Sequence, residues 1–530
     1  MEPERVSVSR YGRFPHAFPF LIAMASVLYL AAENPHEGLT LSNLRDPLVL
    51  ALLYVFVVWA TLSLFVKDRL RRSLVTTAVG VTPLVSGYLF GWLRGQAIEP
   101  ALRGAIETGA LVALMLIGTL VILRVRWLPN AAKFLNIFSS LLVLLTVPAL
   151  LSLGTPEDDT SREHVSEDAG GAKPDIYLVV LDAYSGNESL IESYEFDNSA
   201  IHDSLQERGF KFPTRSRSNY TTTFLSVGSM LNRGYVNDLA EQTGPDYRDR
   251  TALYRYLEFN RTTRDLKGLG YEFVYVGSSY PPMASNRLAD VQYSEIPSRE
   301  FERLWTRMTV LPAVLAMVCP LTSRCVSSAL HFGPESAAET EDRLAFLNSS
   351  VNRQGPKFVY AHWLLPHGPF RFAQDCRPIA PSWTTGDMMI ENDSLARRRY
   401  VDQLVCTNRK ILEFVDAVRA TASDSSVIIL QADHGDGRFP GGRPSSLEAA
   451  DPDQIRERFD VFAAYAGPSG IGDSLALQRT PVNVMRTLVR VLFGFSEPPS
   501  EDRHFWSGRD RPLYLVSVDI DSLFNAATEP

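Results

Sequence analysis

Cysteine is scarce in this chain, and there is no surplus of positive charge. Only four of the 530 residues are cysteines, which excludes a small scaffold held together by disulfides. Lysine and arginine total 52 against 60 aspartates and glutamates, and the net charge of −8 argues against a general nucleic-acid binder. The sequence also lacks internal repeats, a collagen-like period and low-complexity tracts. Its length is too great for one hydrophobic core, so we expect more than one domain.

Long apolar runs are confined to the first 153 residues. Most approach the roughly 20 residues that a helix needs to cross a bilayer, and almost none contains a charge. The five runs cover residues 17–32, 47–66, 73–93, 106–123 and 134–153. Core helices of a soluble bundle would show a polar stripe, which these runs lack. The sequence therefore predicts a five-helix transmembrane domain over residues 1–153.

The charges between the runs predict the orientation of this domain. Basic residues gather before the first run, between the second and third, and between the fourth and fifth, whereas the other two connections carry fewer cations mixed with acids. This alternation follows the positive-inside rule and places the N-terminus in the cytoplasm. Five crossings then place the rest of the chain outside. The first run lacks a clear cleavage pattern, so we expect it to stay as an anchor.

The remaining sequence has a different character. Residues 154–173 are polar and acidic without an apolar period, and we expect them to form a linker. Residues 174–530 alternate short apolar strands with helical patterns, which predicts an α/β domain with a mostly parallel sheet covered by helices. The expected strands are 176–181, 272–276, 358–363, 427–431 and 460–465.

All four cysteines lie in this outer domain. An even number in an oxidising compartment favours two disulfides, with four buried free thiols as the alternative. Three pairings exist, and closeness in the sequence favours Cys319 with Cys325 and Cys376 with Cys406. Their spacing does not resemble a zinc-binding cysteine motif.

Polar side chains follow three of the expected strands. Asp182 comes directly after the first strand, and Asp433 and His434 follow the fourth. Ligands of open α/β sheets bind beyond the carboxyl ends of the strands, so we expect these side chains to meet. Two carboxylates and an imidazole suit one divalent metal ion, and zinc, manganese and magnesium are not distinguished. The alternative for Asp182 is a helix N-cap.

Two histidines belong to the third strand and the turn after it. His367 lies just past the strand and before a Gly-Pro pair, and it is the better candidate for contact with a substrate. His362 lies inside the strand, where it either contacts substrate or is a hydrogen-bonded core residue.

Three consecutive threonines, Thr221 to Thr223, precede an expected helix that runs to about residue 231. A hydroxyl at a helix N-terminus lies near free backbone N–H groups and the positive end of the helix dipole. Metal coordination lowers the pKa of such a hydroxyl and makes it a nucleophile. The alternative is that the threonines only cap the helix.

The order of these motifs resembles the sulfatase-like branch of the alkaline phosphatase superfamily. The resemblance covers nearly all of residues 174–530, from Asp182 through the threonine helix and His367-Gly-Pro to Asp433-His434-Gly. With five membrane helices in front, the chain looks like the lipid A phosphoethanolamine transferases and the lipoteichoic acid synthases. Those enzymes move a phospho-alcohol head group from a membrane phospholipid to an envelope acceptor through a phospho-threonine at a metal.

This resemblance implies roles for individual residues. The family nucleophile falls on Thr223, with Thr222 as its reserve and a candidate for substrate binding. The family metal ligands fall on Asp182, Thr223, Asp433 and His434, and the substrate-contacting histidine falls on His367, with His362 as a second candidate. The resemblance also implies a bacterial inner-membrane protein with its catalytic domain outside, a phospholipid donor, and a glycolipid or glycan acceptor.

The chain departs from the family pattern in several places. Asp182 stands where such transferases usually carry Glu, and the family cysteines flanking the nucleophile are absent. Thr223, Leu225 and Val227 replace the formylglycine precursor, proline and arginine of hydrolytic sulfatases, which disfavours sulfate-ester hydrolysis. The extra ligands of two-metal phosphatases are not evident, which favours one metal. Two alternatives stay open: a phosphodiesterase or phosphatase with water as acceptor, and a catalytically degenerate envelope scaffold.

Overall fold

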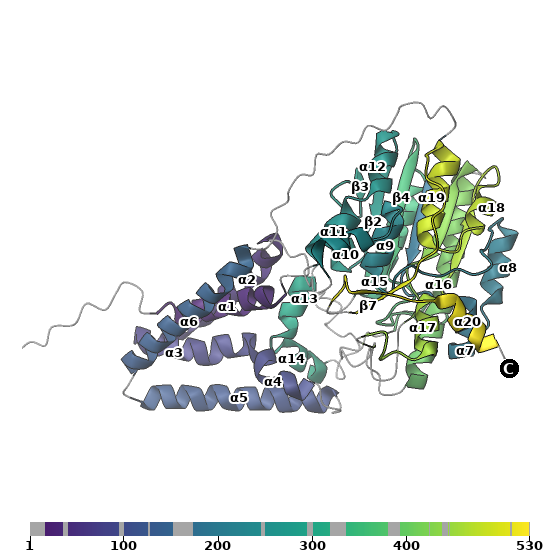
Figure 1. Cartoon of the computed structure of the whole chain (residues 1–530). Coiled ribbons are helices and arrows are strands. Elements are labelled where there is room, and N and C mark those ends of the chain that lie inside the picture. Colours follow the sequence, from purple (N-terminus) through teal and green to yellow (C-terminus); the bar gives the residue numbers. More distant parts are fainter. Residues whose placement is uncertain are drawn as a thin grey trace, which may run out of the picture. The chain divides into compact units, whose positions relative to one another are not determined.

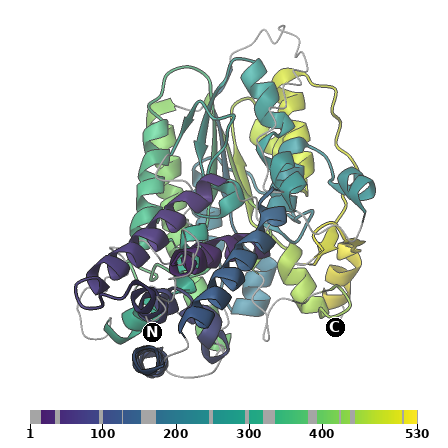
Figure 2. The same cartoon turned by 90° about the vertical axis from the view of Figure 1, so that its left-hand side faces the viewer.

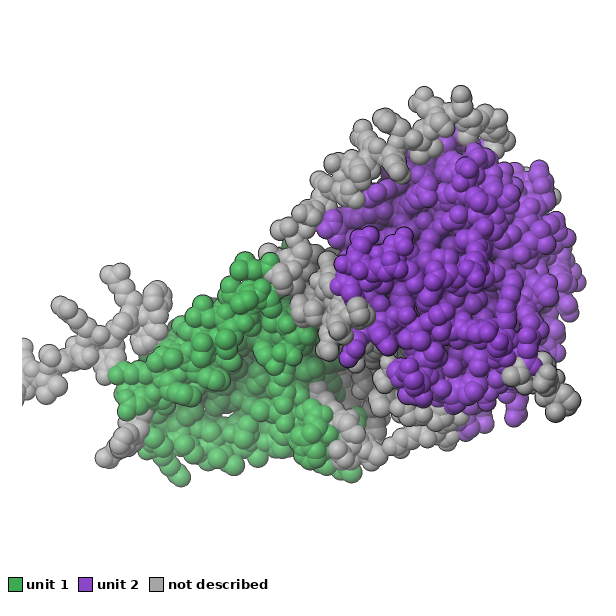
Figure 3. Space-filling view, in the orientation of Figure 1, with its two compact units in different colours: residues 1–35, 39–156, 299–333 green, residues 36–38, 157–298, 334–530 purple. Residues whose placement is uncertain are grey.

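The chain divides into two compact units, coloured separately in Figure 3. Unit 1 comprises residues 1–35, 39–156 and 299–333, and unit 2 comprises residues 36–38, 157–298 and 334–530. Of the residues that we expected within the outer domain, the described stretch 300–318 falls in unit 1. A computed structural model describes residues 16–34, 41–94, 100–125, 128–151, 173–244, 250–293, 300–318, 335–379, 393–422, 425–436, 444, 446–508 and 511–528. The expected linker lies outside these residues except for Lys173.

Unit 1 is helical (Figure 1). Its N-terminal part contains α1 (Phe18–Glu33), α2 (Leu41–Leu62), α3 (Arg69–Thr76), a π-turn η1 (Thr77–Val81), a 3-10 turn η2 (Thr82–Leu84), α4 (Ser86–Arg94), α5 (Pro100–Arg124) and α6 (Leu128–Leu151). Its later part contains α13 (Glu300–Arg307) and α14 (Leu311–Val318). Apolar side chains of α1, α2 and α13 share one buried cluster, which includes Val27, Leu44 and Trp305.

Three helices of unit 1 are long and apolar enough to cross a membrane, namely Asn43–Leu62, Leu102–Arg124 and Leu128–Leu151. The third expected run is not a straight helix, because Arg69–Leu84 and Ser86–Leu93 meet at a bend of 47°. The segment before the bend is irregular, with a π-turn at Thr77–Val81 and a 3-10 turn at Thr82–Leu84 that contains Pro83. The first run forms α1, which has 16 residues and is short for a crossing. The prediction of five equivalent spans is therefore corrected: the described residues contain three candidates, or four if the bent pair counts as one.

Unit 2 is built on a six-stranded sheet in the order β3-β2-β4-β1-β5-β6 (Figures 1 and 2). The strands are β1 (Ile176–Leu181), β2 (Glu272–Val276), β3 (Val291–Gln292), β4 (Lys357–Trp363), β5 (Val427–Ala432) and β6 (Ala463–Ala466). Neighbouring strands run parallel except for β6, which is antiparallel to β5. The expected mostly parallel sheet is confirmed. β3 was not expected, and the strand expected at 460–465 is shorter and begins later.

Helices cover both faces of this sheet, because alternate residues of its strands enter two different cores. In β1, Tyr177, Val179 and Leu181 pack into one core, and Ile176, Leu178 and Val180 into the other. The unit-2 helices are α7 (Asn187–Tyr194), α8 (Ser199–Glu207), α9 (Thr223–Asn232), α10 (Asn237–Thr243), α11 (Thr251–Glu258), α12 (Arg261–Gly268), the 3-10 turn η3 (Pro281–Met283), α15 (Ala337–Ser350), α16 (Asp393–Ala422), α17 (Pro452–Phe459), α18 (Ile471–Ala476), α19 (Pro481–Phe493) and α20 (Ile520–Thr528). All six side chains of β1 are buried, as expected of a strand covered on both faces.

Two further features complete unit 2. A small antiparallel sheet of β7 (Phe505–Ser507) and β8 (Leu515–Ser517) was not expected. A disulfide joins Cys376, in the loop after β4, to Cys406 on α16, which confirms that predicted pair. The predicted pair of Cys319 and Cys325 lies outside the described residues.

Candidate functional site

The sheet register brings the predicted strand-end residues together. Leu181, the last residue of β1, lies opposite Trp363 of β4 and Ala432 of β5. Asp182 and Asp433 each follow one of these aligned positions, so they leave the sheet side by side. The backbone is held there by Asp182 N–H donating to the Trp363 carbonyl over 2.9 Å. Parallel pairing, rather than closeness in sequence, therefore assembles the site.

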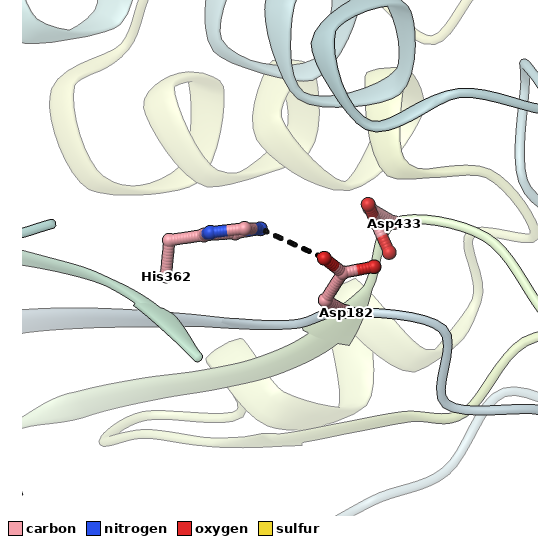
Figure 4. A group of neighbouring side chains, drawn as sticks. All are labelled: Asp182, His362 and Asp433. Carbon is pink, nitrogen blue, oxygen red and sulfur yellow. Dashed lines mark ion pairs between the residues drawn. The ribbon is translucent and has the colours of Figure 1, made fainter. Parts of the chain in front are cut away.

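Asp182, His362 and Asp433 form a group that can hold a metal ion (Figure 4). One ligand atom from each lies within 4.8 Å of the others, and all three residues are buried. Asp182 Oδ1, Asp433 Oδ2 and His362 Nε2 have no hydrogen-bond partner among the described residues. Buried polar atoms without partners are costly, and a divalent cation would satisfy all three. Carboxylate oxygens with imidazole nitrogen suit zinc, and carboxylates also suit manganese and magnesium.

The second oxygen of Asp433 is held by the backbone. Asp433 Oδ1 accepts from the N–H of Ala183 over 3.1 Å and from the N–H of His434 over 2.8 Å. Ala183 has φ of 59°, a left-handed conformation that costs energy for a residue with a side chain. This turn directs the Ala183 N–H at the carboxylate. Asp433 is thus oriented on one side, and its Oδ2 lies 3.4 Å from His434 Nε2.

His362 belongs to this site, because one of its two nitrogens faces the carboxylates. Its Nδ1 lies 2.8 Å from the hydroxyl oxygen of Ser278, and its Nε2 lies 3.9 Å from Asp182 Oδ2. Burial lowers the pKa of His362 to about 3, so the ring is neutral and available as a ligand. His362 is thus a hydrogen-bonded strand residue, as one alternative held, and its other nitrogen lines the site, while its predicted contact with substrate stays a prediction.

His434 joins the carboxylates to the threonine helix. Its Nε2 lies 3.4 Å from Asp433 Oδ2, 3.8 Å from Asp182 Oδ1 and 3.1 Å from the Thr223 hydroxyl oxygen. Its Nδ1 lies 3.0 Å from the carbonyl oxygen of Gly435. A carbonyl only accepts, so Nδ1 carries the proton of the neutral ring and Nε2 presents a lone pair. The structure therefore brings Asp182, Thr223, Asp433 and His434 together.

The three threonines have three different environments. The Thr221 hydroxyl lies 3.4 Å from the Ser507 hydroxyl and accepts from the Ser507 N–H over 3.2 Å. Thr222 is the N-cap residue of α9, but its hydroxyl caps no N–H and is buried without a partner among the described residues. Thr223 is the first residue of α9 and faces His434. Of the three threonines, Thr223 is therefore the one whose hydroxyl lies beside the candidate metal ligands.

His367 reaches the site through its backbone. Its N–H donates to the carbonyl oxygen of Asp182 over 3.1 Å, and the residue is half-buried. Gln403 of α16 donates to the His367 carbonyl over 2.9 Å. The turn after β4 is therefore fixed next to Asp182, and His367 lies at the rim of the buried group.

Burial shapes the charge state of the two carboxyl groups. It raises the pKa of Asp182 to about 7, and the Arg458 and Arg371 charges offset part of this effect. It raises the pKa of Asp433 to about 8, and the nearby charge of Asp182 adds to the rise. Two carboxylates in one buried place favour a proton or a cation between them.

Sequence reasoning missed Ser278 and Arg458. Arg458, near the end of α17, is buried and donates hydrogen bonds to the carbonyl oxygens of Thr221 and Gly435. A single guanidinium thereby connects the threonine turn to the turn that carries Asp433 and His434. Arg458 lies in a helix, where no local pattern in the sequence marks it, whereas Ser278 follows β2 by two residues and could have been found by the strand-end signal.

The chain was compared with known proteins. No family model matches it. None of the curated proteins matches it either. Among solved structures, the C-terminal periplasmic domain of EcEptC from Escherichia coli, in complex with Zn, is similar at 12% identity and a TM-score of 0.42, covering 66% of this chain and 94% of that one.

Two further solved structures are similar to this chain. The integral membrane protein lipooligosaccharide phosphoethanolamine transferase A (EptA) from Neisseria meningitidis matches at 14% identity and a TM-score of 0.40, over 91% of this chain and 96% of that one. The phosphonate monoester hydrolase of Agrobacterium radiobacter matches at 14% identity and a TM-score of 0.39, over 63% and 80%. We take no residue role from likenesses this distant.

Proposed function

We propose that this chain is a membrane-bound, metal-dependent phosphotransferase. It would move a phospho-alcohol head group, phosphoethanolamine or phosphoglycerol, from a phospholipid to an acceptor in the bacterial envelope through a phospho-threonine on Thr223. One observation carries the proposal. The Thr223 hydroxyl lies at the start of α9, 3.1 Å from His434 Nε2 and beside a buried pair of carboxylates with unpartnered oxygens. Phosphoethanolamine transfer is also the activity in the name of EptA.

The environment of Thr223 supports its role as the nucleophile. His434 Nε2 lies 3.1 Å from the hydroxyl oxygen, so the two atoms are placed to share one metal ion, which would lower the pKa of the hydroxyl. The N-terminus of α9 offers backbone N–H groups and a positive field to an incoming phosphate. The buried, unpartnered hydroxyl of Thr222 would donate to a phosphate oxygen.

Asp182, Asp433, His434 and Thr223 would hold one divalent metal ion, with His362 as a further ligand or a substrate contact. When bound, the ion supplies a positive charge that lowers the pKa of the threonine hydroxyl and stabilises negative charge on the phosphate. The unpartnered oxygens of both carboxylates and the free Nε2 of His362 fit this role. We leave zinc, manganese and magnesium as the candidates.

In the first step, Thr223 Oγ1 forms a bond to phosphorus while the bond from phosphorus to the diacylglycerol oxygen breaks. The hydroxyl proton passes to solvent water, and the leaving oxygen takes up a proton, for which we assign His367. In the second step, an acceptor hydroxyl forms a bond to the same phosphorus and gives its proton to His367, while the bond from Thr223 Oγ1 to phosphorus breaks and Thr223 Oγ1 recovers a proton from water. Diacylglycerol stays in the bilayer, which accounts for a catalytic unit attached to membrane helices.

We further propose that the chain is integral to the bacterial inner membrane, with unit 2 outside. The three long apolar helices and the alternation of basic loops support this. A topology of five crossings requires that both α1 and the bent third segment cross the bilayer. Reporter fusions after each segment would test that number.

The experiment that tests the function uses the full chain in vesicles of phosphatidylethanolamine, or of phosphatidylglycerol, with zinc, manganese or magnesium. We expect mass spectrometry to find phosphoethanolamine or phosphoglycerol on Thr223, and diacylglycerol to be released. Thr223→Ala should abolish both the adduct and the release. Thr222→Ala serves as the neighbouring control and should still form the adduct. A Thr223→Ala variant that keeps full activity contradicts the proposal.

Product analysis distinguishes transfer from hydrolysis. A hydrolase forms the same adduct but releases the free phospho-alcohol without any acceptor, whereas a transferase accumulates the adduct until an acceptor glycolipid is added. A degenerate scaffold would bind no metal. The unpartnered ligand atoms of Asp182, Asp433 and His362 support a metal-binding enzyme over that scaffold.

A further inference from the structure

We propose that α13 and α14 form a second membrane attachment of the outer part of the chain. These helices lie in sequence between β3 and α15 of unit 2, yet they belong to unit 1 (Figures 1 and 3). We call residues 300–318 the docking hairpin. It is held at the outer face of the membrane helices, where it closes the break in the third apolar segment. Neither the catalytic proposal nor the metal site is needed for this inference.

The turn of the docking hairpin pairs with the broken segment. Pro83 and Gly87 flank the break at Val85, where the helical hydrogen bonds are interrupted. Val310 N–H donates to the Pro83 carbonyl over 2.8 Å, and Gly87 N–H donates to the Met308 carbonyl over 2.8 Å. A break in an apolar segment is tolerated where protein satisfies the polar groups of its backbone. The hairpin supplies one donor and one acceptor to this break.

The close approach at Gly87 requires glycine. A Cβ atom at this position would lie 2.5 Å from the Met308 Cα and 2.9 Å from the Met308 carbonyl oxygen, both of which are backbone atoms. No flexible side chain can move aside to relieve that overlap. Gly91 lies one turn further along α4, and a Cβ there would meet nothing within 4 Å. Gly87 is therefore a specific contact point, and Gly91 is its natural control.

Apolar surface joins the hairpin to the helices beside it. Phe301 and Trp305 of α13 are buried in the cluster that includes Leu44 of α2 and Leu84 at the break. α14 reads LPAVLAMV, contains no charged residue and packs against α5 (Figure 1). Met317 of α14 is 37% exposed. An uncharged apolar helix with an exposed side chain is more stable in lipid than in water.

The hairpin contacts the membrane helices at the same face of the membrane on which unit 2 is proposed to lie. If the basic connections are cytoplasmic, α2 enters the bilayer from outside at Leu41 and the third segment reaches the outside near Leu84. The hairpin contacts lie at those two ends, through Leu44 and the break. A segment of the outer part of the chain can only arrive from that side. The contacts of the hairpin and the distribution of basic connections therefore indicate the same side of the membrane.

The test uses the full chain in phospholipid vesicles and a cysteine introduced by Phe301→Cys. A water-soluble maleimide should label this cysteine slowly, because the position is 3% exposed. Gly87→Val should raise the labelling rate at least tenfold by pushing the hairpin away, and Gly91→Val should leave it unchanged. Equal rates in both glycine variants, or fast labelling without either change, overturn the proposal. The chain without the new cysteine gives the background.

A second measurement needs no variant and applies even if Gly87→Val does not accumulate. A lipid-soluble diazirine is activated by light in vesicles containing the unaltered chain, and labelled peptides are identified by mass spectrometry. We expect label on α14, at Met317 above all, as well as on α5. Label on α5 with none on α14 overturns the proposal. Both outcomes are independent of Thr223 chemistry, so failure of the catalytic proposal does not alter them.

Discussion

The guanidinium of Arg458 holds the carbonyl oxygen of Thr221 with two hydrogen bonds, 2.9 Å from Nε and 2.6 Å from Nη2. Its Nη1 donates to the Gly435 carbonyl oxygen over 2.8 Å. The same oxygen accepts the hydrogen bond from His434 Nδ1. One side chain therefore fixes the turn before Thr223 and the ring orientation of His434. Residues that orient metal ligands in this way affect metal binding without touching the ion.

Arg458→Lys should weaken zinc binding by about 10- to 100-fold, since an ammonium cannot bond both carbonyls in the same geometry. Isothermal titration calorimetry on the metal-free chain measures this. Arg233→Lys is the matched control, because Arg233 is equally buried but pairs with Asp265 and Glu497 near the far end of α9. Equal zinc affinity in Arg458→Lys and the unaltered chain would contradict the assigned role.

Metal binding should weaken as the pH falls. Burial raises the pKa of Asp182 to about 7 and that of Asp433 to about 8, so both are largely protonated at pH 6 without metal. Metal must displace those protons, and each displaced proton changes the affinity about tenfold per pH unit below the pKa. We expect at least a tenfold loss of zinc affinity between pH 8 and pH 6. Calorimetry in buffers of different ionisation enthalpy counts the released protons, and a count of zero would speak against this site.

The metal-free protein should lose stability as the pH rises from about 4 to about 8. The folded-state pKa values of Asp182 and Asp433 lie above their ordinary value of 3.8, so the folded chain binds more protons than the unfolded chain in this window. Thermal unfolding in a chelator measures the effect. Asp433→Asn removes one buried charge and should flatten the pH dependence. Added zinc should raise the midpoint in the unaltered chain.

Ser278→Ala should reduce activity about tenfold by releasing the His362 ring, whose Nδ1 lies 2.8 Å from the Ser278 hydroxyl. The effect should appear in the rate and in metal affinity rather than in the amount of folded protein. Ser229→Ala is the control, because Ser229 is equally buried but bonds only within α9, to the Ser226 carbonyl. Equal losses of activity in both variants would mean that the effect comes from disturbed packing and not from release of the His362 ring.

Gly435→Ala should destabilise unit 2 by about 1–3 kcal/mol or more and disturb the site. Its Cβ would lie 1.8 Å from the Glu457 carbonyl oxygen, a backbone atom beside Arg458. Gly228→Ala in α9 meets only Tyr256, at an ordinary 3.4 Å, and should be neutral or stabilising. Chemical unfolding of both variants gives the comparison. A Gly435→Ala chain as stable as the unaltered one would contradict this packing.

The strand-end pattern was a sound guide because parallel strands share one edge. It placed Asp182 and Asp433 at that edge from sequence alone, and the register of β1 with β4 and β5 brings them together with His434. The catalytic and metal roles stay predictions. Ser278 follows β2 in the same way and lies within reach of this pattern, whereas Arg458 could not be found, because its contacts join segments that are distant in the sequence.

Unit 1 shows what hydropathy can and cannot establish. Apolar length predicted α2, α5 and α6 well. It does not reveal the break in the third segment, which contains Pro83. The docking hairpin was missed because α13 carries charged residues and α14 has only eight residues, below the length that signals a membrane helix. Its location depends on contacts with residues more than 200 positions earlier, such as Met308 with Gly87.

The strand order also constrains biosynthesis. β1 is made first, yet both of its neighbours, β4 and β5, come much later in the chain. While translation proceeds, β1 has no partner until Lys357–Trp363 has crossed to its final compartment, and Asp182 has no companion carboxylate until Asp433 follows. Such long-range pairing forms slowly and leaves apolar strands exposed in the interval. If unit 2 is exported and holds a metal ion as proposed, the ion is acquired only when export is nearly complete and comes from the pool on the far side of the membrane.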